Sequence, residues 1–165
     1  TGAFVTRDEF ARLADCCRDR GAPLIVDEVF ADYAFDAGTD ARRARVLERD
    51  DVIVFSLGGL SKTVGLPQAK LAWIGVSGPS SRIPEVMARI EFACDTYLSV
   101  STPVQIAAPD LLSRGAVIRN QIHSRVLRNR RHLAAVDLHA VAARCSSASS
   151  SSDWGSSRSV NSPVR

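Results

Sequence analysis

The sequence predicts an α/β fold, in which a mostly parallel sheet is flanked by helices. Three features support this prediction: an amphipathic helical segment near the start of the chain, short apolar runs that suit buried strands, and a long helical stretch after them. Hydrophobic residues make up 45% of the 165 residues, so most of the chain can contribute to a core.

The first helix is expected over residues 6–20. Thr6 and Glu9 have the spacing of a capping box, in which a hydroxyl and a carboxylate satisfy N–H groups at the helix start. Gly21 follows, and glycine readily adopts the left-handed conformation that ends a helix. The helix therefore has a start signal and a stop signal of its own.

Strands are expected at residues 24–26, 52–57 and 71–76. All three runs are continuously apolar, which is typical of strands that helices cover on both faces. The first run is closed by Asp27.

Further helices are expected over residues 84–97 and 103–112, with Pro109 bending the second. Gly115 is expected to break the helix, and a long helix should then cover residues 116–143. We place a domain boundary after residue 143.

Residues 144–165 form the tail of the chain and are dominated by serine, with six serines among residues 146–152. Such a segment buries too little apolar surface to offset its ordering entropy, so we expect it to lack fixed structure. A reading-frame slip in the source sequence is the alternative.

Composition disfavours several functional classes. The net charge is only +3, and no aromatic or groove-reading motif accompanies the basic residues, so we expect no nucleic-acid partner. No apolar run is long enough to span a membrane. The cysteines form no C-x-x-C pair and do not cluster with histidines, which predicts no metal site and a reduced, cytoplasmic protein. They are Cys16, Cys17, Cys94 and Cys145.

The pattern richest in chemical information covers residues 56–70. Lys62 lies in a glycine-rich turn directly after an apolar strand, and a second cation, Lys70, follows one loop later. Glycines let the backbone approach a ligand closely, and a partly desolvated lysine can attack an aldehyde. Taken by itself, the pattern also fits a solvated loop lysine.

Asp27 is the second candidate, because it ends an apolar strand with a carboxylate. An ionised carboxylate there needs a cationic partner. A protonated pyridine nitrogen would serve, and the carboxylate would keep that ring protonated as an electron sink. The alternative is an aspartate that caps the next helix.

Together these segments resemble the class I/II aminotransferases, which are pyridoxal-phosphate (PLP) enzymes of fold type I. Thr1-Gly2 is similar to the second half of the family's Asn-Pro-Thr-Gly turn. The features that follow have the order seen in the family. They are a helix, the strand ending at Asp27, a second strand, Ser61-Lys62 and a cation eight residues after the lysine. The resemblance covers residues 1–143 and implies part of the large domain plus the start of a small domain.

The resemblance also implies the roles of individual residues. Lys62 would be the catalytic residue, holding PLP as a Schiff base and moving a proton between the substrate and the cofactor. Asp27 would hold the pyridinium, Val29 would pack under the ring, and Lys70 would hold the phosphate, helped by Ser61 or a backbone N–H.

Some positions depart from the family pattern. Phe30 stands where a tyrosine usually donates to the ring oxygen, Lys70 stands for the usual arginine, and Gly59 replaces a phosphate-binding serine. Tyr33 is nearby but out of register, and we expect it to have a packing role.

The implied activity is the transfer of an amino group from an amino acid to a 2-oxo acid, in a homodimer to whose interface residues 95–103 would contribute. We expect the chain to be the middle part of such an enzyme, inactive alone. The first alternative is another activity of fold type I enzymes, such as that of a β-lyase or a decarboxylase. A non-catalytic effector domain of a transcription regulator is the second.

Overall fold

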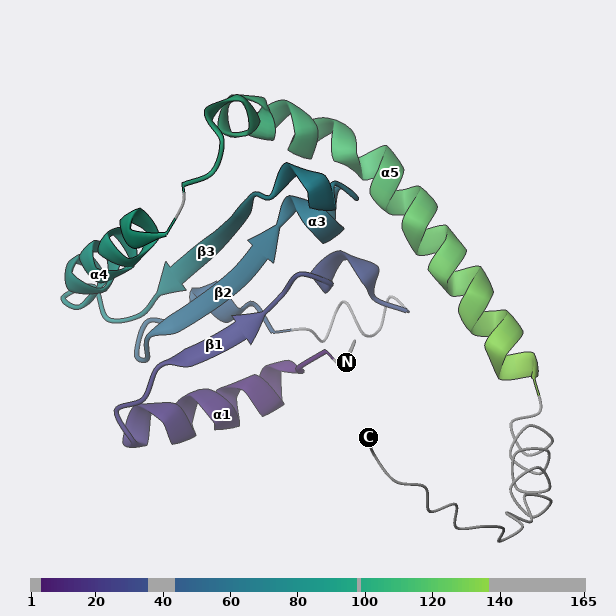
Figure 1. Cartoon of the computed structure of the whole chain (residues 1–165). Helices are drawn as coiled ribbons and strands as arrows, with labels where there is room; N and C mark the ends of the chain where they lie inside the picture. The colour runs from purple at the N-terminus through teal and green to yellow at the C-terminus, as the bar shows by residue number, and fades with distance from the viewer. Residues whose placement is uncertain (1–3, 36–43, 98, 137–165) are drawn as a thin grey trace, which may run out of the picture. The chain divides into compact units, whose positions relative to one another are not determined.

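The computed structural model describes residues 4–35, 44–97 and 99–136. Residues Thr1–Leu127 form one compact unit, which contains every described strand (Figure 1). The predicted boundary after residue 143 and the serine-rich tail lie outside the described residues.

The described strands are β1 (Leu24–Asp27), β2 (Val54–Gly59) and β3 (Ala72–Ser77), in the spatial order β1-β2-β3. β1 pairs with β2 in parallel, and β3 runs antiparallel to β2. Two of the three strands therefore point the same way, and helices accompany them (Figure 1). The predicted α/β class is confirmed.

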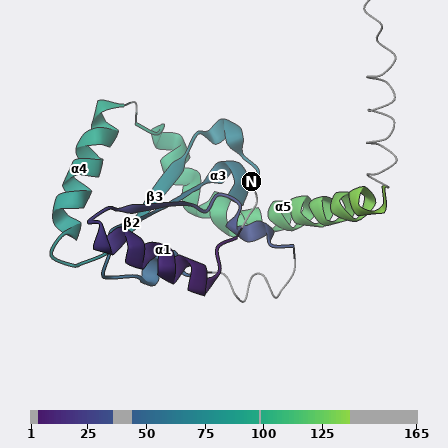
Figure 2. The ribbon, with the colours of Figure 1, turned by 90° about the horizontal axis from the view of Figure 1, so that it is seen from below.

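Helix α1 (Arg7–Asp19) begins and ends where the sequence predicts. The Thr6 hydroxyl accepts from the backbone N–H of Glu9 at 3.4 Å, and Thr6 donates its own N–H to the Glu9 carboxylate at 2.9 Å. Gly21 has a φ of 63°, in the left-handed region. Figure 2 shows α1 lying along one face of the sheet, where Phe10 and Ala14 are buried in the core.

The prediction that all three strands are buried on both faces is wrong for the outer two. β2 is the most buried strand, and Val54 is fully inaccessible. β1 alternates, with Ile25 64% exposed, and the first half of β3 is exposed. The physical reason is that α1 covers only the face of β1 that carries Leu24 and Val26.

The predicted helix break at Gly115 is also wrong. Helix α4 (Ile83–Thr96) agrees with the prediction, but α5 (Thr102–Ala135) runs without interruption through both Pro109 and Gly115. Gly115 is buried, and a Cβ atom built there would lie only 2.1 Å from Cγ1 of Val64. The glycine allows α5 to pack closely against the turn after β2. Its low helix propensity gave no indication of this packing role.

An ion-pair network ties the end of α1 to the segment before β2. Arg18 contacts Asp15 at 2.8 Å and Asp51 at 2.9 Å, while Arg49 contacts Asp15 at 2.6 Å and also bonds Asp51. The hydrogen bonds from Arg49 and then Arg18 lower the pKa of Asp51 from 3.8 to about 2.

We predict that Gly115→Ala destabilises the protein by about 1–2 kcal/mol, because overpacking at Val64 outweighs the roughly 1 kcal/mol gain in helix propensity. Chemical denaturation measures the free energy of unfolding. Asn120→Ala, at an exposed position of the same helix, is the matched control and should be neutral or slightly stabilising. A Gly115→Ala protein more stable than the wild type would contradict this packing role.

The network around Asp51 makes a pH-dependent prediction. Because the pKa of Asp51 is depressed in the folded state, its contribution is fully present above pH 3.8 and is lost as the pH falls towards about 2. Solvent screening limits the contribution to about 0.5–1 kcal/mol. Asp51→Asn should therefore lower stability at pH 6 and have little effect near pH 2 in thermal unfolding. An equal loss at both pH values would be evidence against the ion pairs.

Candidate active site

The carboxyl ends of β1 and β2 bring the candidate segments to one edge of the sheet. Asp27, the last residue of β1, is in register with Leu57 of β2. The next N–H, from Glu28, donates to the Leu57 carbonyl at 3.0 Å. Because parallel strands end on the same side, the turn after Asp27 and the turn that carries Lys62 leave the sheet at the same edge. Ligands usually bind at this edge in open α/β sheets.

Asp27 is exposed, and its Oδ1 accepts a hydrogen bond from the Val29 N–H at 3.1 Å. This contact is a local turn contact with the residue two positions on, and it occupies only one carboxylate oxygen. The alternative of an aspartate that caps the next helix is wrong, because the following 3₁₀ turn, Ala31–Tyr33, begins at Phe30 and has no side-chain cap. Within the described residues, Asp27 forms no ion pair. Val29 is half-buried beside it.

Lys62 lies on the short helix α3 (Leu60–Thr63), directly after β2. The expectation of a partly desolvated lysine is wrong for this structure, because Lys62 is exposed. The fully buried Leu60 anchors α3 to the core, and Lys62 then projects from the surface. Its Nζ lies 5.5 Å from the centroid of the Phe30 ring, a cation–π contact that links the two turns.

Tyr33 connects the same two turns through the backbone. It lies in the 3₁₀ turn η1 (Ala31–Tyr33), is buried, and donates its hydroxyl to the carbonyl of Lys62 at 2.6 Å. Burial, followed by the nearby Asp32, raises the pKa of Tyr33, so the hydroxyl stays protonated and able to donate. The sequence predicted packing for this residue, and its hydrogen bond was missed.

Lys70 follows the 3₁₀ turn η3 (Pro67–Ala69) and is exposed, with a φ of 51° in the left-handed region. The chain returns to the sheet immediately afterwards, since the Leu60 N–H donates to the Leu71 carbonyl at 3.0 Å. Across the described ranges, neither Lys62 nor Lys70 has a carboxylate partner.

A small cavity of about 230 Å³ opens beside α3 and brings together three of the predicted residues, namely Phe30, Ser61 and Lys62. Asp27, Val29 and Lys70 do not line it. The remaining lining residues are mostly apolar: Phe4, Tyr33, Phe35, Ile122 and Val126.

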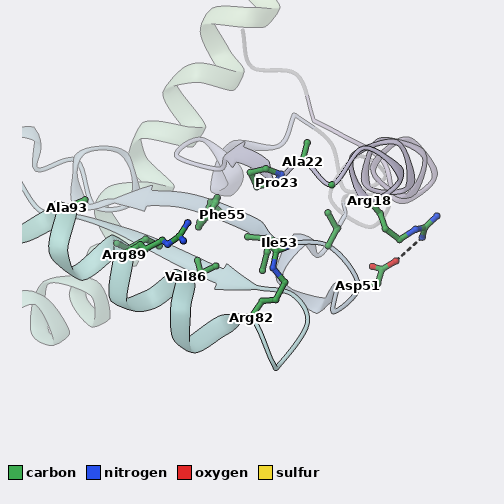
Figure 3. A pocket seen from close by; sticks show the side chains of 13 residues that line it. Arg18, Ala22, Pro23, Asp51, Ile53, Phe55, Arg82, Val86, Arg89 and Ala93 are labelled. Carbon is green, nitrogen blue, oxygen red and sulfur yellow. Dashed lines mark hydrogen bonds and ion pairs between the residues drawn. The ribbon is translucent and has the colours of Figure 1, made fainter.

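A larger hollow of about 440 Å³ lies between α4 and the sheet (Figure 3). Its walls include Pro23 and Ile53, which precede β1 and β2, so it opens towards the amino ends of these strands. None of the predicted site residues lines it. Lys62 lies at the opposite end of the strands.

Residues 1–143 match the model of the family described as aminotransferase class I and II. The chain belongs to this family. Among curated proteins, no relative matches the sequence significantly.

Family membership confirms the resemblance. Enzymes of this family are typically PLP-dependent and belong to fold type I. Within the described residues no helix is long and apolar enough to cross a membrane. The same residues contain no group of three or more histidine, cysteine or acidic side chains that could hold a metal ion.

We predict that Lys62→Ala changes the free energy of unfolding by less than about 0.5 kcal/mol, because the side chain is exposed. Leu60→Ala, two residues earlier and fully buried, should cost about 2–5 kcal/mol. Urea denaturation of both variants checks the contrast. A large loss of stability in Lys62→Ala would mean that the lysine is part of the packing.

Proposed function

We propose that this chain carries the cofactor-attachment segment of a PLP-dependent aminotransferase, with Lys62 as the residue that forms the Schiff base. The observation that supports this proposal most strongly is the meeting of the two candidate turns at the carboxyl edge of β1 and β2. Among the described residues, the Lys62 amine at this edge has no carboxylate partner, and the Asp27 carboxylate has no cationic partner. A ligand can satisfy both.

The side chains at this edge fit the functional groups of PLP. An amine is needed for the aldehyde, a carboxylate for the pyridinium, and a cation for the phosphate. Lys62 supplies the amine, Asp27 the carboxylate and Lys70 the cation. Along the chain the three follow the family's order, with Asp27 first, Lys62 second and Lys70 third. When bound, PLP supplies an electron sink for negative charge at the substrate's α-carbon.

Each residue then has a defined task. The Lys62 amine attaches the cofactor and, once released by the substrate's amino group, moves the proton at the α-carbon. The Asp27 carboxylate keeps the ring nitrogen protonated, because an adjacent negative charge favours the cationic form. Lys70 attracts the phosphate as a point charge, without the two-pronged hydrogen bonding that arginine offers.

Val29, Phe30 and Ser61 complete the proposed site. Val29 packs under the ring, and Ser61 or a backbone N–H contributes to the phosphate contacts. Phe30 cannot donate to the ring oxygen as the usual tyrosine would, but its ring lies below the Lys62 amine. Through this contact Phe30 holds the unliganded amine over the site.

The proposed substrates are an amino acid and a 2-oxo acid, in the cytoplasm. The proposed assembly is a homodimer, and apolar exposure supports it. Phe92, Tyr97 and Ile106, on or beside α4 and the start of α5, are 76–77% exposed. Large apolar side chains that are exposed in this way can contribute to an association surface.

The lysine content of the chain makes the proposal directly testable. Of the 21 lysine and arginine residues, only Lys62 and Lys70 are lysines. After incubation with PLP and reduction with borohydride, peptide mass spectrometry should find the pyridoxyl group on Lys62 at least about tenfold more often than on Lys70. Equal labelling of the two lysines, or a preference for Lys70, would contradict the assignment.

Two variants control this experiment. Lys70→Arg keeps the cation and removes the other lysine, so labelling of Lys62 should persist. Lys62→Ala should remove the label and the yellow absorbance of the imine, while the protein remains folded. A Lys62→Ala protein that stayed yellow would place the attachment elsewhere.

A further inference from the structure

The backbone at the end of α3 is held by two side chains from distant parts of the chain. The last carbonyls of a helix have no partner within the helix. In α3, the carbonyls of Lys62 and Thr63 accept from outside: the Tyr33 hydroxyl donates to the first at 2.6 Å, and the Arg119 guanidinium donates to the second at 3.4 Å. Two consecutive peptide groups, one of them that of Lys62, are thus fixed.

Both donors are supported by contacts between η1 and α5. Arg119 lies 3.5 Å from the Asp32 carboxylate. The Tyr33 ring makes an edge contact with His123, at a centroid distance of 6.0 Å, and His123 Nε2 lies 2.7 Å from the Ala34 carbonyl. The donors and their supports come from η1 and from α5, which passes beside α3 (Figure 1).

The close packing of α5 fixes the spacing of this arrangement. Gly115 leaves no room for a side chain against Val64, and a Cβ atom built on Gly65 would lie 3.1 Å from both Ile118 and Ile122. Arg119 is one turn beyond Gly115 on the same helix, and His123 is one turn further, so these positions share a face of α5. That face is the one directed at α3.

We propose that Tyr33 and Arg119 form a clamp that positions Lys62 for attack on an aldehyde; this inference rests on the proposed function. Lys62 has a long, flexible and exposed side chain, and the cation–π contact with Phe30 constrains only its far end. Fixing the peptide groups at residues 62 and 63 orients the Cα–Cβ bond from which the amine extends. Tyr33 and Arg119 are positioning residues, since neither reaches the reacting atoms.

The hydroxyl of Tyr33 is the decisive feature of the clamp. A phenylalanine would fill the same space and keep the ring contacts with Phe30 and His123. It cannot donate to the Lys62 carbonyl as the tyrosine hydroxyl does. Removing it leaves the packing intact and frees the backbone under the lysine.

Tyr33→Phe tests the clamp through the ratio of borohydride-trapped pyridoxyl on Lys62 to that on Lys70 in the same molecule. The ratio should fall about fivefold, which corresponds to the loss of one hydrogen bond. Tyr97→Phe is the matched control, because Tyr97 is the other tyrosine and is 76% exposed. This control should leave the ratio unchanged.

Arg119→Met provides an independent second variant, with Arg125→Met, an exposed position on the same helix, as its control. Circular dichroism and the unfolding temperature must show that each variant is folded under the labelling conditions. Amide hydrogen exchange of Val64, whose N–H bonds the Leu60 carbonyl, should accelerate in both clamp variants. If Tyr33→Phe fails to fold, the labelling ratio and the amide exchange of Arg119→Met test the clamp instead.

The outcomes separate the two proposals. If the wild type shows no preference for Lys62, the assignment of the Schiff-base lysine fails, and the clamp fails with it. If the wild type prefers Lys62 and folded Tyr33→Phe and Arg119→Met proteins retain the full preference, only the clamp is overturned. A reduced ratio with faster exchange at Val64 supports both.

Discussion

The parallel pairing of β1 with β2 is the constraint on which the candidate site depends. The register that places Asp27 opposite Leu57 makes both strands end at one edge, so the turns that follow them meet. The antiparallel return of β3 then draws the chain back, and the bond from the Leu60 N–H to the Leu71 carbonyl closes the loop that carries both lysines. Buried Leu60 holds this loop against the core. Charged groups can therefore remain exposed at the edge while their backbone is fixed.

Local sequence signals predicted the elements that depend on local physics. The capping box of Thr6 and Glu9 and the left-handed Gly21 set the limits of α1 because their partners lie within a few residues. At Gly115 the local sequence signal led to a wrong prediction. Its low helix propensity suggested a break, but contact with Val64, about fifty residues away in sequence, decides its role. The burial of the outer strands was mispredicted for the same reason, since apolar strands do not reveal how many helices cover them.

In the candidate site too, features encoded along the sequence could be predicted, and contacts between residues far apart in sequence could not. The family could be predicted because its pattern runs along the chain, and the match over residues 1–143 confirms it, while the roles of Asp27, Lys62 and Lys70 stay predictions. The bond from Tyr33 to the Lys62 carbonyl joins residues 29 positions apart, so spacing gave no indication of it. A tyrosine in a short turn that follows Asp27 is the one signal that could have suggested it. Together, the edge and the clamp describe a surface lysine whose backbone is more constrained than its exposure implies.

A crystal structure of the protein soaked with PLP and reduced with borohydride tests the central claim most directly. We expect continuous density from Lys62 Nζ to the pyridoxyl group, with the ring nitrogen within about 3 Å of the Asp27 carboxylate. Density on Lys62 with the ring turned away from Asp27, and its nitrogen exposed to solvent, would contradict the claim that the two turns at the ends of β1 and β2 form one cofactor site.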